Sequence, residues 1–380
     1  MTDNDVQGQR ISSLDIMKGL MMILIVVIHI IYLAESDTER PTSSSPIVIQ
    51  MMYLGMMLFF ISSGYFFRPG RGIGKNIRKR MVQLLVPILI GLTVLPAILY
   101  VYLTVLGQGP TLDDLLPSYK AILGGVNVFR PYDEPYVDVG MCFVFNGYYF
   151  LQLLVVAFLL FYPLAEKVLD DRRKLIVSIV ILIACTALLR EFVDVRLPFY
   201  SQLSPLAAAF MLFGAALGRR QVVEYIENGE KDLRYWSIFA GALAVTVVME
   251  LLFPTGTGFD NTFFGDFGGY SAFTYFIASC SMCYVLLVIG SLFSKIPLLS
   301  SALSVSGRHS IALICLHIFV IKLFMAPFHH LSHVKTFPQV PMTEAVIYWI
   351  VAVTIIVLAA EYIPRYIGKH TMKTDAEGTE

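Results

Sequence analysis

The sequence predicts an all-α fold: a polytopic membrane helical bundle of about ten transmembrane helices, with both termini cytoplasmic. Of the 380 residues, 57% are hydrophobic and only 15% are charged, whereas about 25% of the residues in a soluble domain are charged. Apolar runs of about 20 residues recur along the chain, the length that crosses a hydrocarbon core of about 30 Å. Lysine and arginine concentrate in alternate connections between these runs. We expect residues 1–380 to form one integral-membrane domain.

Ten apolar runs, each bounded by charged residues or by proline and glycine clusters, are the predicted helices. In chain order they lie near residues 14–34, 46–67, 81–106, 147–165, 174–190, 203–218, 235–253, 272–293, 309–327 and 343–363. A polar, serine-rich stretch follows the first run, a basic loop follows the second, and charged turns end the fourth, fifth and sixth. The connections near 107–146 and 254–271 are longer and rich in aromatic and small polar residues.

Lysine and arginine are distributed unevenly between these connections. One alternate set of segments, which includes both termini, holds 20 of them, and the other set holds 6. Cytoplasmic segments of membrane proteins carry the excess of positive charge. The sequence therefore predicts that both termini and the basic loop at 68–80 lie in the cytoplasm. The 28 acidic and 28 basic residues balance overall, so net charge does not indicate a nucleic-acid partner.

The first predicted helix contains three ionisable residues, Asp15, Lys18 and His29. At about 100° per residue they fall on one face about 60° wide, and about 21 Å separates Asp15 from His29 along the axis. Ionisable groups inside a membrane normally face a bundle interior or a water-filled cavity. The sequence thus predicts a polar path from Asp15 and Lys18, on the cytoplasmic side, to His29. In the alternative interpretation Asp15 and Lys18 pair with each other, and His29 binds a neighbouring carbonyl group.

A second intramembrane histidine, His317, lies about 13 Å from Arg308 along the ninth predicted helix, close to the bilayer midplane. Histidine accepts a proton near neutral pH because its unperturbed pKa is about 6.5. His29 and His317, at neighbouring depths, are therefore candidates for a general base that deprotonates a hydroxyl group. The alternative for each is a hydrogen bond that links two helices.

The basic loop RPGRGIGKNIRKR carries six Lys or Arg within 13 residues. Arginines such as Arg78 and Arg80 could hold the phosphates of a nucleotide-like ligand. Attraction to anionic lipid on the cytoplasmic side explains the same charge. Cys280 and Cys283 form a CxxC pair inside an apolar run, without a second pair of ligands, so we expect packing there and no metal.

The two long outer connections contain VNVFRPYDEPYVDVG and FDNTFFGDFGGYSAF. Aromatic rings can stack on a sugar face while neighbouring polar groups bind its hydroxyls, so these segments indicate a polyol ligand. An interfacial aromatic belt interrupted by turns explains the same composition.

Several pieces of the sequence resemble the integral-membrane acyltransferase-3 family, in particular its fucose 4-O-acetylase-like branch. They are Arg10-xxx-Leu14-Asp15-xx-Lys18-Gly19 with the helix to His29, LFFISSGYFF with its basic loop to Arg80 and Pro87, NGYYFLQLL, and SGRHSIALICLH ending at His317. Position 18 is Lys where many relatives have Arg. The resemblance implies ten spans and an O-acetyltransferase that uses cytoplasmic acetyl-CoA on bacterial envelope glycans.

On this resemblance we expect an O-acetyltransferase of the bacterial cell membrane that acetylates a carbohydrate or glycan hydroxyl outside the cell. Its donor would be acetyl-CoA, it would need no metal, and it would bind no nucleic acid. His29 and His317 are the expected catalytic residues. Asp15, Lys18, Ser62 and Ser63 would shape the inner mouth of the pore, with a serine hydroxyl as a candidate oxyanion donor. Arg10, Arg78 and Arg80 would bind CoA phosphates.

A transporter or flippase of a lipid-linked glycan is the competing function class. It would also have many spans, a polar path and aromatic outer loops, but it would move its substrate without acyl transfer. The sequence contains neither an internal repeat of useful strength nor broken helices in matching halves, the features typical of such transporters. A membrane sensor or assembly partner would need no acyl donor at all.

Overall fold

The computed structural model describes residues 12–34, 54–70, 72–112, 148–193, 197–229, 232–252, 271–329 and 340–377, with residues 115, 119 and 195. These residues are almost entirely helical and contain no strand, which confirms the all-α prediction for this part of the chain. The helices are α1 (Ser12–Ala34), α3 (Leu58–Tyr65), α4 (Ile73–Val105), α6 (Tyr148–Val168), α7 (Arg172–Phe192), α8 (Ser204–Arg219), α9 (Val222–Asn228), α10 (Leu233–Leu252), α12 (Ala272–Phe293), α13 (Pro297–Arg308), α14 (Ser310–Met325) and α15 (Met342–Glu377), and the 3₁₀-helix η2 (Pro198–Leu203) leads into α8.

The described helices include six that are long and apolar enough to cross a membrane. These are α4, α6, α7, the segment Pro198–Arg219, α12, and residues Thr343–Tyr362 of α15. The number rises to eight if each of two bent pairs, α9 with α10 and α13 with α14, is one span. The polytopic helical bundle is thus confirmed. The count of ten and the cytoplasmic termini stay predictions, and residues 46–53 of the predicted second run lie outside the described residues.

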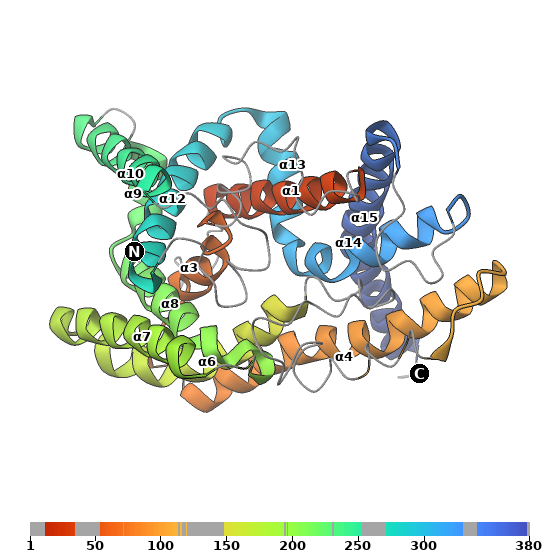
Figure 1. Ribbon diagram of the computed structural model, residues 1–380, viewed down its shortest axis with the longest axis horizontal. Coiled ribbons are helices and arrows are strands. Elements are labelled where there is room, and N and C mark those ends of the chain that lie inside the picture. Colours follow the sequence, from red (N-terminus) through yellow and green to blue (C-terminus); the bar gives the residue numbers. More distant parts are fainter. Residues whose placement is uncertain are drawn as a thin grey trace.

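α1 lies in the middle of the molecule and is buried over its first half. Leu14, Ile16, Met17 and Met21 are at most 1% exposed. Figure 1 shows α1 between α3 and α12 on one side and α15 on the other, and α1 contacts all three helices. The polar residues near its start therefore face protein, as expected for ionisable groups in a membrane bundle.

α4 and α7 have the opposite character and lie along one edge of the molecule (Figure 1). On α4 large apolar side chains recur every three or four residues and are about half exposed, among them Val86, Val94 and Val101. Such a long apolar stripe would be a liability in water. In a bilayer it is the surface that contacts lipid, which agrees with the length and hydropathy of both helices.

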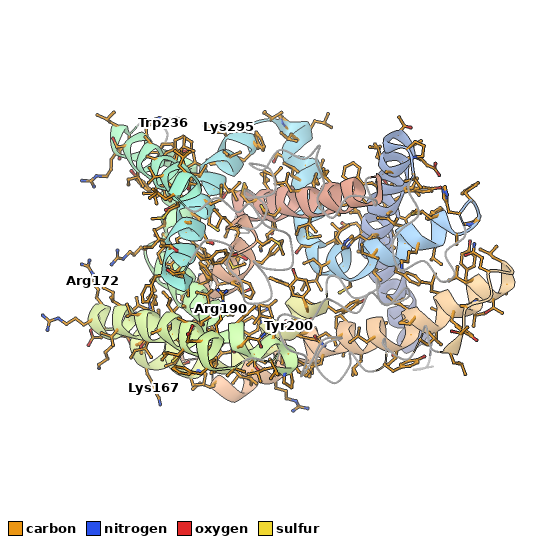
Figure 2. The ribbon with its side chains drawn as sticks, viewed as in Figure 1. Lys167, Arg172, Arg190, Tyr200, Trp236 and Lys295 are labelled. Carbon is orange, nitrogen blue, oxygen red and sulfur yellow. The ribbon has the colours of Figure 1, made fainter. Side chains whose placement is uncertain are left out.

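The α6–α7 turn is polar. Asp171 caps α7: its Oδ1 accepts hydrogen bonds from the backbone N–H groups of Lys174 (3.3 Å) and Arg173 (2.8 Å). These two bonds hold the pKa of Asp171 below its usual range, because they stabilise the ionised carboxylate. Lys167 and Arg172, on either side of the turn, lie near the left edge of the bundle in Figure 2.

α1 and α13 meet backbone to backbone. A methyl group added at Gly307 would lie 1.8 Å from the Asp15 carbonyl oxygen, and one added at Gly19 would lie 2.0 Å from the Leu303 carbonyl oxygen. Small residues allow this close approach, as is common between membrane helices. The contact places the end of α13 directly against the polar start of α1.

α3 and α8 show the same kind of packing. Gly214 and Gly218 form a GxxxG pair on α8, and added methyl groups there would lie 2.0 Å from the Ile61 oxygen and 2.2 Å from the Tyr65 oxygen. Gly64 approaches the Met211 oxygen in return, at 1.9 Å from an added methyl group. This close packing fixes the position of the last turn of α3, which borders the candidate site.

Candidate active site

The buried start of α1 carries a charged pair. Lys18 Nζ lies 3.8 Å from Asp15 Oδ1, and the side chains of Lys18 and Asp15 are 18% and 12% exposed. Lys18 Nζ also lies 5.7 Å from the centre of the Phe66 ring, just after α3. The i, i+3 pairing considered from the sequence is therefore present, and a cation–π contact joins the pair to a second element.

A short helix that sequence analysis did not identify, α9, holds the ends of α1 and α3. Glu227 Oε1 accepts a hydrogen bond of 3.1 Å from the Ser13 backbone N–H, in the first turn of α1, where N–H groups lack helical partners. Tyr65, the last residue of α3, donates its hydroxyl hydrogen bond to Glu224. The only sequence signal was two glutamates three residues apart in a polar connection, VVEYIEN. α9 thus positions both elements that carry the charged pair and Phe66.

The basic segment begins at Arg68, two residues after Phe66. Its second half is helical, because α4 begins at Ile73, so Arg78 and Arg80 lie in the first turns of a helix and not in the loop that the sequence predicted. Arg78 is exposed. Arg80 donates a hydrogen bond of 3.1 Å to Gln83, and its guanidinium carbon lies 5.7 Å from the centre of the Phe158 ring. The loop is fastened to α6 by a hydrogen bond of 3.2 Å from the Gly70 N–H to Glu166. Arg78 is thus directly accessible to a ligand phosphate.

The serines predicted as oxyanion donors use their hydroxyls inside α3. Ser62 and Ser63 both donate to the Phe59 carbonyl oxygen, at 3.0 Å and 2.7 Å. Ser62 is buried at 3% exposure. In this conformation each hydroxyl proton is engaged by a carbonyl group of the preceding turn, so donation to an oxyanion would require rotation of the side chain.

His317 is buried in α14, at 1% exposure. Its Nδ1 lies 2.7 Å from the Leu313 carbonyl oxygen, and because a carbonyl oxygen only accepts, Nδ1 carries the hydrogen. In the neutral ring Nε2 then holds the lone pair, which is the nitrogen that could receive a proton. α14 contacts both α1 and α15, so His317 belongs to the same helix cluster as the charged pair.

Tyr148 supports α14 close to this histidine. It is 2% exposed and donates a hydrogen bond of 3.0 Å to the Cys315 carbonyl oxygen. Its ring passes Gly91 of α4, where an added methyl group would lie 1.9 Å from the hydroxyl oxygen. Tyr148 thereby connects α6, α4 and α14. Its position in the segment NGYYFLQLL was the sequence signal, but only the fold shows which carbonyl it binds.

The side chains of two predicted site residues lie outside the described part of the chain. Arg10 lies outside the described residues, and His29 has its backbone in α1 while its side chain lies outside the described part. The roles predicted for both stay predictions.

The cysteines of the CxxC pair lie in α12. Cys283 is buried and its sulfur lies 3.8 Å from the Leu54 carbonyl oxygen, a contact between helical segments. Within the described residues no three His, Cys, Asp or Glu side chains gather closely enough to hold a metal ion.

Comparison with known proteins identifies the family to which the chain belongs. Neither the search of curated proteins nor the search of solved structures found a match. The model of the acyltransferase-3 family, described as an acyltransferase domain, matches residues 11–361. This match includes the charged pair, the basic loop and His317, and it covers nearly the whole bundle. Because the family model matches residues 11–361 and several helices are long and apolar enough to cross a membrane, the chain is a membrane acyltransferase that belongs to the acyltransferase-3 family.

Proposed function

We propose that this protein moves an acetyl group from cytoplasmic acetyl-CoA to a hydroxyl group of an extracytoplasmic carbohydrate, in the bacterial cell membrane. The family supports acyl transfer in a membrane protein. The observation that carries the finer proposal is the Asp15–Lys18 pair, which is largely buried at the start of the central helix and contacts Phe66, two residues before the basic loop. An anionic donor entering from that end would meet the positive charge of the basic loop first and then the Asp15–Lys18 pair.

The contacts of α4 and α14 indicate which features lie at the same end of the bundle. α4 begins in the basic loop and is about 50 Å long. Gln108 lies just after the other end of α4. It donates a hydrogen bond of 2.5 Å to the carbonyl oxygen of Ala326, which lies just after the end of α14. Gly307, which touches Asp15, lies just before α14 begins. The basic loop and the charged pair are therefore at one end, and Gln108 and Ala326 are at the other.

In this proposal the basic loop, including the exposed Arg78, and Arg10 bind the CoA phosphates. His29 takes the proton of the acceptor hydroxyl, and His317 assists. The acceptor oxygen bonds to the acetyl carbon, the thioester C–S bond breaks, and CoA leaves as the thiolate.

Two measurements test the proposal. Purified protein should bind CoA in calorimetry, and mass spectrometry of surface glycans from cells with and without the gene should differ by acetyl groups on carbohydrate. A transporter or flippase would move unmodified glycan and would leave acetylation unchanged. Identical acetylation in both strains would contradict the proposed acceptor class.

A further inference from the structure

A histidine–glutamate pair lies at the end of the bundle opposite to the basic loop. His329 Nε2 lies 2.6 Å from Glu344 Oε1, and Tyr348 donates its hydroxyl hydrogen bond to the same oxygen at 2.5 Å. The pair joins the segment after α14 to the first turn of α15. The side chains of His329 and Glu344 are 22% and 32% exposed, so a ligand in solution can reach them.

The pair has hydrogen-bonding capacity left for a ligand. Because the carboxylate accepts, His329 Nε2 carries the hydrogen, and Nδ1 holds the lone pair of the neutral ring. A carboxylate offers about four acceptor sites, and both bonds to Glu344 use Oε1. Within the described part of the chain, His329 Nδ1 and Glu344 Oε2 form no hydrogen bond. Two acceptors are thus available at a partly exposed position.

Neighbouring groups hold this pair in place and add an aromatic face. Gln108 donates to the His329 carbonyl oxygen at 3.0 Å, and the His329 N–H donates to the Met325 carbonyl oxygen at 2.9 Å. Phe328, the adjacent residue, is 75% exposed. A fixed polar pair with an exposed ring on the adjacent residue suits a carbohydrate, which offers hydroxyl donors along one edge and C–H groups on one face.

We infer that Phe328, His329 and Glu344 bind the carbohydrate acceptor. One sugar hydroxyl donates to His329 Nδ1, another donates to Glu344 Oε2, and the apolar face of the ring rests on Phe328. The identity of this ligand as the acceptor depends on the proposed function. The site lies at the end of α14 farthest from the charged pair, where an extracytoplasmic acceptor would arrive.

The molecule contains a matched pair that allows a controlled test. His309 Nε2 lies 2.6 Å from Glu361 Oε2, with side chains 19% and 23% exposed, and it joins α14 to α15 at the opposite end. If His329 only ties two helices together, substitution of either histidine by glutamine should have the same effect.

The test measures binding of methyl glycosides of fucose, galactose and glucose to the full-length protein in nanodiscs by saturation-transfer NMR. His329→Gln can keep a bond to Glu344 but loses the ring nitrogen acceptor, and Phe328→Ala removes an exposed ring whose loss should not affect folding. We expect each substitution to raise the Kd for the bound glycoside about tenfold or more, and His309→Gln to leave it unchanged. Absence of binding to the unaltered protein, or equal effects of His329→Gln and His309→Gln, would overturn the inference.

A second readout separates this site from the proposed function. The same glycosides are offered with radiolabelled acetyl-CoA, and acetyl transfer is followed against glycoside concentration. Binding that depends on His329 without any transfer would support the site and contradict the proposed acetyl transfer to carbohydrate. Transfer with the same acceptor KM in His329→Gln and His309→Gln would support the proposed function and contradict the site.

Discussion

At the residue scale, the most specific prediction concerns His29. If it is the general base, His29→Ala should lower acetyl transfer by about 10²–10⁴-fold, the usual contribution of a positioned base. CoA affinity and melting temperature should change little. His29→Gln keeps hydrogen-bonding capacity but cannot take the proton, so it should be almost as inactive. Steady-state rates at saturating acetyl-CoA provide the measurement.

A purely structural His29 would behave differently. The glutamine variant would then keep most of its activity, whereas the alanine variant would lose activity together with thermal stability. That result would transfer the role of general base to His317, whose Nε2 already holds the lone pair in the neutral ring.

Arg78 and Arg80 carry a second residue-scale prediction. Replacing both with Gln should weaken CoA binding, since each hydrogen bond to a charged phosphate is worth about 1.5–3 kcal/mol. The effect of Arg78 should be the cleaner one, because Arg78 is exposed while Arg80 also contacts Phe158. Calorimetry with CoA measures the change. Arg172→Gln is the control, because it removes an exposed positive charge at the α6–α7 turn, and equal weakening by that control would indicate a nonspecific charge effect.

At the element scale, the contact between α1 and α13 sets the position of the charged pair. Gly307→Ala would place a methyl group 1.8 Å from the Asp15 carbonyl oxygen, a backbone atom that cannot turn away. We expect the helices to separate at a cost of about 1–3 kcal/mol, with a lower melting temperature and reduced acyl transfer.

Gly241→Ala in α10 is the matched control for this contact. Nothing lies within 4 Å of a methyl group added there, and alanine is favoured over glycine in a helix by about 0.8–1.0 kcal/mol. Thermal unfolding in detergent should therefore show an unchanged or slightly higher melting temperature for Gly241→Ala. A stable Gly307→Ala protein with full activity would show that the close approach of α1 and α13 is not needed.

At the scale of the whole molecule, the orientation of the bundle can be tested without reference to its chemistry. The charge distribution predicts that residues 43 and 256 lie outside the cell and that Asn228, at the end of α9, lies inside. Cysteines introduced at Ser43 or Gly256 should react with an impermeant thiol reagent in intact cells, and one introduced at Asn228 should not. Labelling in the reverse pattern would place the basic loop and the donor on the outer side.

The sequence predicted more of the fold than of the contacts at the candidate site. The apolar runs and their flanking charges correctly predicted an all-α membrane bundle. Asp15 and Lys18, which the sequence assigns to one face of a helix, are only 12% and 18% exposed in it. The hydroxyls of Ser62 and Ser63 bond to Phe59 instead of pointing to a ligand, a local competition that the sequence pattern does not reveal. The contacts of α9 were missed because Glu227 and its partner Ser13 lie 214 residues apart.

The sequence by itself determined that the chain is a helical membrane protein and that Asp15 and Lys18 share one face of its first helix. In lipid a backbone must satisfy its own hydrogen bonds, so about 20 apolar residues in succession form a helix whatever their neighbours are. Helical periodicity also assigns each charged residue to a face. Only the tertiary structure decided which faces meet: α13 against Asp15, α9 across the ends of α1 and α3, and His329 beside Glu344. Partners of this kind are selected by packing between distant segments, which no local pattern encodes.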